Sequence, residues 1–262
     1  MNKFDASTIE QFIAGRSAVQ VETVEETSST QHLAKEYLAH HSDGGPVAFF
    51  ADRQTAGYGQ HGRHYYSPKQ TGLYMSILLP AQSMMQFRKS GLMTTATAVV
   101  LCQVLERFFP DSELTVKWVN DVYKDRAKIA GILTEAVYQL GNDKANLIMG
   151  IGINLTTQVF PDEIKGKAGA LSADSRVDRN QLAAELLVAL LEMVENYEGG
   201  SYLDEYRRRC FLLGRFVSVR TGQEMIEGTA VDITKAGALV VEDGEHHRHV
   251  IRSGEVEKVN YK

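Results

Sequence analysis

The sequence has little cysteine, proline or tryptophan: its 262 residues include 2 Cys, 5 Pro and 1 Trp. Cys102 and Cys210 lie far apart in apolar, helix-like surroundings and match no zinc-site or C-x-x-C spacing, which favours buried free thiols and a reducing cytoplasm. No stretch approaches about 18 uninterrupted apolar residues, so no membrane span is expected. The opening MNKFDASTIEQF lacks the apolar core of a signal peptide.

The charge balance is only mildly acidic, with a formal net charge of −5. This argues against a general polyanion binder, although a local basic patch remains possible. A chain that is 44% hydrophobic and 23% charged has an ordinary soluble globular composition. Its length fits one large domain, or one large and one small domain.

Apolar periodicity predicts helices and strands that alternate irregularly along the first part of the chain. Helices are expected at 4–14, after an N-cap within Ser28–Thr30, at 86–109, at 180–197 and at 202–212. Strands are expected before Ser28, at 46–53, at 72–80 (ending at Pro80) and as four strands between 114 and 155, with turns at KDRA and GNDKA.

The character of the chain changes after Gly214. Short β-rich runs are broken every eight to twelve residues by Gly, Asp or Asn, which is typical of a small barrel or sandwich. We therefore predict a main domain at 1–213 and a small β domain at 214–262. The mixture of helices with antiparallel hairpins indicates an α+β fold for the main domain.

A glycine-rich stretch, QTAGYGQHGRHYYSP, runs from Gln54 to Pro68. It lacks the G-x-x-x-x-G-K-[ST] pattern of a Walker loop. It also runs into polar and aromatic residues, whereas a dinucleotide fingerprint opens a long apolar helix. A mobile surface loop and a ligand-binding loop both remain open on this stretch alone.

A second stretch, KWVNDVYKDRAKIAG, places Lys117, Asn120, Asp121 and Lys128 within twelve residues. Strand alternation would set Lys117 and Asp121 on one face if the strand continues between them. A lysine between the KDR turn and the apolar IAGIL needs an anionic partner if its ammonium is covered. The alternative is an Asp–Lys salt bridge that ties a hairpin.

The third stretch, MGIGINL, has Gly150 and Gly152 inside a strand, with Asn154 directly after. Glycines inside a strand weaken it, because they have no side chain to pack, unless a ligand or another group must approach the backbone closely. A β-bulge followed by a turn asparagine is an equal alternative.

Together these stretches supply cations, an amide, a carboxylate and a flexible loop. That set suits a reaction that brings a carboxylate and a nucleotide phosphate together, because such a reaction needs charge neutralisation more than a protein nucleophile.

Read together, these motifs resemble the biotin protein ligase family, from about Thr27 to the C-terminus. The resemblance rests on Gly57–Arg63, on KWVND at Lys117–Asp121, on KIAGIL at Lys128–Leu133 and on GIGIN at Gly150–Asn154. It implies a mixed sheet with helices in a class II synthetase-like catalytic fold, and a small C-terminal SH3-like barrel. It also implies ATP-dependent conversion of biotin to biotinyl-5′-AMP and transfer of biotin to a lysine of a carrier domain.

Site residues are carried over position by position from the resemblance. Lys128, Asp121 and Arg63 would be catalytic, with Lys128 between the biotin carboxylate and the α-phosphate and Asp121 beside the acceptor lysine. The biotin site would comprise Ser29, Thr30 and Gln54 at the ureido ring, with Gly57, Tyr58, Gly59, Gln60, Lys128 and Gly131. The ATP site would comprise Arg63, Tyr65, Lys117, Asn120, Gly152 and Asn154.

This sequence departs from the usual family pattern at several of these positions. The family usually has Arg at Tyr58 and Gln60, Trp at Tyr65, Pro at Val119 and Asn at Gln31. The loss of two arginines from the loop predicts weaker retention of the adenylate.

The resemblance also implies the cofactors and partners. ATP and Mg²⁺ would be required, with biotin as substrate and no metal held directly by protein ligands. The acceptor would be the biotin carboxyl carrier protein of acetyl-CoA or pyruvate carboxylase, and a homodimer through the main sheet is plausible. Only about 20 residues precede the matched region, which predicts no DNA-binding domain and no repressor role.

Two alternative functions remain open. Lipoate or octanoate transfer is the nearest, but lipoate has no ureido ring for Ser29, Thr30 and Gln54. A non-catalytic biotin-binding protein would not need Lys117, Asn120, Asp121 and Lys128.

The histidines are interpreted structurally. His246, His247 and His249 alternate across a strand and cannot all converge on a metal, so a solvated hairpin edge is favoured. His40 and His41 are expected at a helix end, where a positive charge suits the dipole.

Overall fold

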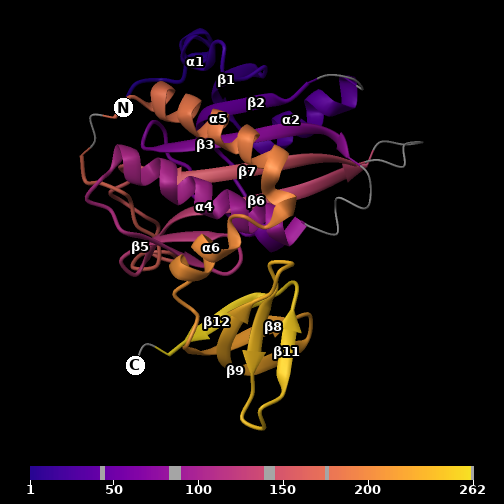
Figure 1. Cartoon of the computed structure of the whole chain (residues 1–262). Coiled ribbons are helices and arrows are strands. Elements are labelled where there is room, and N and C mark those ends of the chain that lie inside the picture. Colours follow the sequence, from indigo (N-terminus) through magenta and orange to yellow (C-terminus); the bar gives the residue numbers. More distant parts are fainter. Residues whose placement is uncertain (42–44, 83–89, 139–144, 175–176, 261–262) are drawn as a thin grey trace.

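The computed structural model describes residues 1–41, 45–82, 90–138, 145–174 and 177–260. Its main element is a seven-stranded mixed sheet in the order β1-β2-β3-β7-β6-β5-β4 (Figure 1). Strand β1 is parallel to β2, and each of the other neighbouring pairs is antiparallel. The strands are β1 Gln20–Thr27, β2 Val47–Gln54, β3 Gly72–Gln82, β4 Leu114–Lys117, β5 Asp121–Lys124, β6 Ala127–Tyr138 and β7 Ala145–Asn154.

Helices cover the sheet unequally. On one face, α4 and α5 pack against each other and enclose the main core, with α1 against α5 and α6 against α4 (Figure 1). On the other face, α2 packs on β2, β3 and β7 through a smaller apolar cluster that includes Leu38, Phe49 and Ile148. The bounds are α1 Ala6–Ile13, α2 Thr30–His40, α4 Ser90–Phe108, α5 Arg179–Asn196 and α6 Leu203–Arg209.

Period-2 alternation explains how one strand serves both layers. In β2, Ala48 and Phe50 belong to the main core, whereas Val47 and Phe49 belong to the cluster under α2. Successive side chains of a strand point to opposite faces, so a continuous apolar run is what a doubly covered strand requires. Since α2 lies over only part of its face, the rest of that face is left for other residues.

A second, five-stranded antiparallel sheet follows α6, in the order β11-β10-β9-β8-β12. It lies below the main sheet in Figure 1. Its strands are β8 Phe216–Thr221, β9 Glu224–Ile233, β10 Leu239–Glu242, β11 Arg248–Ile251 and β12 Glu255–Val259. The predicted class, α+β with a small C-terminal β module, is confirmed.

Most predicted elements are present, including the four strands between 114 and 155 and the turn at KDRA. Ser29 caps α2, as expected, because its side chain accepts a hydrogen bond from the backbone N–H of Gln31. The expected turn at GNDKA and the first residues of the 86–109 helix fall outside the described residues. Cys102 and Cys210 are buried free thiols.

Two predictions about strands are wrong. Strand β3 does not end at Pro80 but continues to Gln82, which pairs with Ala145. The pairing shifts register between Leu79 and Gln82, and a proline, which has no N–H to donate, is tolerated at such an irregularity.

The second error concerns the KWVND stretch. No continuous strand runs through it, because β4 ends at Lys117 and β5 begins at Asp121. The chain turns between them, and Lys117 and Asp121 become directly opposed cross-strand partners. They share a face because opposed residues of an antiparallel pair project to the same side, not because of alternation.

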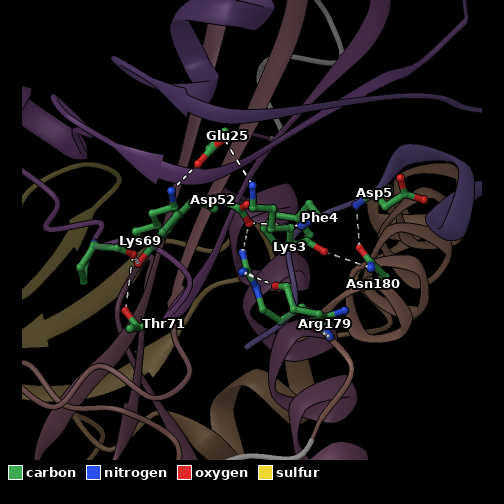
Figure 2. A network of polar contacts seen from close by, with 12 residues as sticks. Lys3, Phe4, Asp5, Glu25, Asp52, Lys69, Thr71, Arg179 and Asn180 are labelled. Carbon is green, nitrogen blue, oxygen red and sulfur yellow. Dashed lines mark hydrogen bonds and ion pairs between the residues drawn. The ribbon is translucent and has the colours of Figure 1, made fainter.

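A buried ion pair joins three distant segments at the edge of the main core (Figure 2). Arg179, at the start of α5, lies 3.0 Å from Asp52 of β2, and both side chains are almost fully buried. The Arg179 guanidinium also donates to the carbonyl of Asn2 (2.8 Å), and the N–H of Phe4 donates to Asp52 (3.2 Å). The N-terminal segment is thereby attached to both β2 and α5.

Candidate active site

A pocket lies on the α2 face of the main sheet, where α2 leaves the strands uncovered. The first turn of α2, the glycine-rich loop, β6, β7 and the loop before β12 all contribute to its lining. Gly131 of β6 is paired with Gly152 of β7, and Gly150 lies two residues away on the same face. These three glycines form a floor without side chains.

The bare floor lets other side chains cross it. A Cβ on Gly152 would lie 2.5 Å from the ring of Tyr65, and one on Gly150 would lie 2.9 Å from the side chain of Gln31. Strand β7 stays in register with both neighbours through these positions. The glycines of GIGIN therefore allow close approach, and the alternative of a β-bulge there is excluded.

At one end of the pocket, short polar side chains meet in a buried cluster. The side-chain carbonyl of Gln54 accepts from the backbone N–H of Thr30 (2.9 Å), and its amide donates to Ser67 (2.8 Å). Thr30 also accepts a hydrogen bond from Ser76 of β3 (2.8 Å). Ser29, Thr30 and Gln54 are thus brought together, as the resemblance implied, and all three line the pocket.

Charged groups gather at the other end. The Lys128 ammonium lies 2.5 Å from the carboxylate of Asp121, on the neighbouring strand β5. Lys117 lies opposite Asp121, and burial lowers the pKa of its ammonium while Asp121 acts in the other direction. Asn120 donates to the carbonyl of Ile132 (2.8 Å), which holds its amide at the pocket wall.

The Asp–Lys pair was the alternative interpretation of this stretch, and the structure contains it. The pair is not a simple surface salt bridge, since both residues line the pocket. Asp121 holds an ammonium in place beside the glycine floor at Gly131, whose Cβ position would be 3.2 Å from Lys128. Such a cation is positioned to meet an anionic ligand.

The C-terminal sheet supplies part of the wall that the sequence did not reveal. Glu255, the first residue of β12, forms an ion pair with Arg63 of the glycine-rich loop. This contact lowers the pKa of the Glu255 carboxyl group. Lys117 donates to the carbonyl of Val256 (2.7 Å), so two predicted site cations contact the small β module.

The glycine-rich loop lines part of the pocket and is anchored by Tyr58. Its hydroxyl group accepts from Lys35 (2.9 Å) and donates to Glu135 (3.0 Å). Gly59 and Gln60 also line the pocket, whereas Gly57 lies behind them, where a Cβ would come within 2.7 Å of Gln54. The loop is therefore held in place by hydrogen bonds and contributes to the pocket lining.

Two predicted nucleotide contacts differ in their exposure to the pocket. Tyr65 lines it, and burial raises the pKa of its hydroxyl group well above the usual value. Asn154 does not line it: its amide donates to the carbonyl of Gly169 (3.0 Å), and its oxygen accepts from Tyr65 (3.3 Å). In this structure Asn154 therefore contacts Tyr65 but not the pocket itself.

Sequence reasoning missed Glu255, Lys35 and Glu135. Lys35 does carry a weak signal, because it lies four residues after Gln31, on the same face of the predicted helix. Glu135 carries no local signal, since it is the single acidic residue in a strand of mixed composition. Glu255 carries none either, since it shares a short strand with Glu257 and Lys258.

The histidine run lies at the tip of the β10–β11 hairpin. His246 and His247 are exposed, and His249 bonds to Asp243 (2.7 Å) on the same hairpin. Strand β11 is the edge of its sheet, as expected. Over the described ranges, neither a helix able to span a membrane nor a group of three or more His, Cys, Asp or Glu able to hold a metal was found.

Two family models match the chain. The biotin/lipoate A/B protein ligase family matches residues 23–154, and the biotin protein ligase C terminal domain matches residues 212–259.

Similar proteins are known from several bacteria. The bifunctional ligase/repressor BirA of Escherichia coli is 33% identical over 205 residues, which cover 74% of this chain and 61% of that protein. The chain thus spans about three fifths of this relative's length. The biotin--[acetyl-CoA-carboxylase] ligase of Mycobacterium tuberculosis is 29% identical over 88% of this chain and 86% of its own. A structure of biotin protein ligase from Aquifex aeolicus in complex with biotin and ATP superimposes with a TM-score of 0.75 at 28% identity, covering 92% and 99% of the two chains.

Proposed function

We propose, from the premise that this chain belongs to the biotin/lipoate A/B protein ligase family, that it activates biotin with ATP and transfers it to a carrier-protein lysine. The observation that carries the proposal is the Lys128–Asp121 pair beside a bare glycine floor, with the cluster of Ser29, Thr30 and Gln54 at the opposite end. A ligand with a polar ring at one end and a carboxylate at the other matches this layout.

The first half-reaction joins two anions. The biotin carboxylate attacks the α-phosphorus of ATP, an anhydride forms, and pyrophosphate leaves. Lys128 would neutralise the charges of the biotin carboxylate and the α-phosphate. Arg63 and Lys117 would face the leaving phosphates. Fixed cations in a site closed to water contribute most to such a step.

In the second half-reaction, the amine of the carrier lysine attacks the biotinyl carbonyl, an amide forms and AMP leaves. The attacking nitrogen must first lose a proton. Asp121 is the proposed acceptor or positioning group, because its carboxylate lies at the pocket wall next to Lys128.

Mg²⁺ would enter with the ATP phosphates. Magnesium is commonly bound through one or two carboxylates together with substrate phosphates. The described pocket lining contains the carboxylates of Asp121 and Glu255, which fits an ion that is completed by the nucleotide. We assign no protein ligand to it.

The acceptor, location and assembly are also proposals. The acceptor would be the carrier domain of acetyl-CoA or pyruvate carboxylase, and the buried free thiols of Cys102 and Cys210 suit a reducing cytoplasm. A homodimer would form through the main sheet, whose outer strands are β1 and β4.

Exchange of labelled pyrophosphate into ATP tests the first half-reaction. The expected result is exchange that requires biotin and is not supported by lipoate. If biotin supports no exchange, the proposal is wrong, and if lipoate alone supports it, lipoyl transfer replaces biotinylation.

Replacing Asp121 by asparagine should block transfer more than adenylation. Removing a general base typically costs about 100- to 10,000-fold, and this loss should fall on single-turnover transfer from preformed adenylate. Adenylation should fall less, because Lys128 loses its partner but keeps its charge. Equal loss in both half-reactions would instead make Asp121 a purely structural or metal-positioning residue.

Replacing Gln60 by arginine should slow the release of biotinyl-AMP by roughly 2- to 30-fold. A charge-assisted hydrogen bond exceeds a neutral one by about 0.5–2 kcal/mol, which corresponds to that factor. Gln60 lines the pocket, and the hydroxyl group of Tyr58 is already bound to Lys35 and Glu135. The measurement is a chase of preformed adenylate with excess biotin, and unchanged or faster release would contradict the prediction.

A further inference from the structure

A network of four polar side chains lies between α2, the glycine-rich loop and β6, next to the pocket floor. Glu135 is at its centre: it accepts from Gln31 (2.7 Å), from Lys35 (2.9 Å) and from Tyr58 (3.0 Å). Three donors thus converge on one carboxylate. The catalytic scheme above uses none of these contacts except the anchoring of Tyr58.

The network determines which way the Gln31 amide points. An ionised carboxylate only accepts hydrogen bonds, so the group of Gln31 that faces Glu135 must be its NH₂. With Lys35 on the same carboxylate (2.9 Å), the charge of Glu135 is matched by an ammonium. The side-chain carbonyl of Gln31 must therefore point away from Glu135.

That carbonyl oxygen is buried and has no hydrogen-bond partner among the described residues. The whole residue is only 3% exposed. A buried acceptor without a donor is destabilising, so such an atom in a pocket wall is a position where a ligand donor would be stabilising.

The oxygen lies over the glycine floor. It is 2.9 Å from the position that a Cβ on Gly150 would occupy, and Gln31 and Gly150 both line the pocket. Its neighbours in the first turn of α2 are Ser29 and Thr30, which belong to the polar cluster. A ligand whose ring reaches that cluster therefore passes next to this acceptor.

We propose that Gln31 is a specificity-determining residue whose side-chain carbonyl accepts a hydrogen bond from a ring N–H of the acyl substrate, and that Glu135 is the positioning residue that orients it. This inference rests on the proposed function and deepens it. Biotin carries two ureido N–H groups, whereas a dithiolane ring such as that of lipoate carries no donor. A site built to pair with an N–H rejects an analogue that lacks one, because the buried acceptor is then left unpaired.

Equilibrium binding tests this without requiring catalysis. Gln31→Met keeps the length of the side chain but removes the acceptor, and its dissociation constant for biotin should rise about tenfold by calorimetry. Its dissociation constant for lipoate should stay unchanged or fall. The matched control is Gln158→Met, an exposed glutamine that bonds to the carbonyl of Ala173 and should leave both constants unchanged.

Biotin methylated at either ureido nitrogen identifies the donor. With the wild-type protein, one of the two isomers should bind more weakly than biotin because it lacks the N–H that Gln31 accepts. In Gln31→Met, the penalty for that isomer should shrink, since a coupled pair loses its interaction only once. If Gln31→Met does not fold, Gln31→Leu completes the same comparison.

The outcomes separate this inference from the proposed function. Wild-type protein that binds no biotin overturns both. Biotin binding that is equal in wild type and Gln31→Met, an equal loss of biotin and lipoate affinity, or methylation penalties that are the same in both proteins overturns the role of Gln31 alone.

Discussion

Replacing Lys128 by alanine should lower biotin-dependent pyrophosphate exchange by about 100- to 1000-fold, the effect of removing one preorganised group that stabilises charge in a transition state. The attacking carboxylate and the α-phosphate repel each other, and Lys128 is the cation placed beside the glycine floor. In the structure the carboxylate of Asp121, on β5, holds this ammonium at 2.5 Å.

The matched control is Lys69→Ala. The Lys69 ammonium pairs with Glu25 at the protein surface, away from the pocket, and its loss should leave exchange unchanged. Circular dichroism and a thermal melt would show that both variants are folded. Near-wild-type exchange in folded Lys128→Ala would remove Lys128 from the reaction.

Replacing Arg179 by methionine should lower the free energy of unfolding by about 3–5 kcal/mol, as expected when one partner of a buried ion pair is removed. Asp52 would keep a buried charge without its cation, 2% exposed beneath the N-terminal segment. The variant also loses the hydrogen bond to Asn2 and the contact of the guanidinium with the Phe4 ring, 3.8 Å from its centre. Urea denaturation followed by circular dichroism measures the change.

Arg53→Met provides the control on the neighbouring residue. Arg53 pairs with Glu26 at 2.8 Å, but both side chains are about half exposed. Exposed pairs typically contribute about 0–1 kcal/mol. If the free energy of unfolding fell by the same small amount in both variants, the buried Arg179–Asp52 pair would contribute no more to stability than an exposed pair.

Local patterns were sufficient for most of the secondary structure. Ser29 precedes an amphipathic run and caps α2, and the apolar runs broken by Gly, Asp and Asn after Gly214 became the strands of the small sheet. These features depend on neighbours within a few residues, so sequence patterns report them directly. The two errors arose where partners mattered: Pro80 sits at a shift of register that only pairing with β7 reveals, and Lys117 and Asp121 face each other across a turn.

The same difference between local and long-range information applies to the residues of the site. Lys117, Asn120, Asp121 and Lys128 lie within twelve residues, so the sequence by itself indicated that they lie close together and share one chemistry. It could not indicate that Glu255 pairs with Arg63, 192 residues away, or that Glu135 orients Gln31 across 104 residues. Such contacts depend on which strands become neighbours and in what register, and a one-residue shift would move each side chain to the other face. The sequence therefore determined the elements and the reactive groups, whereas only the tertiary structure decided which distant side chain completes each of them.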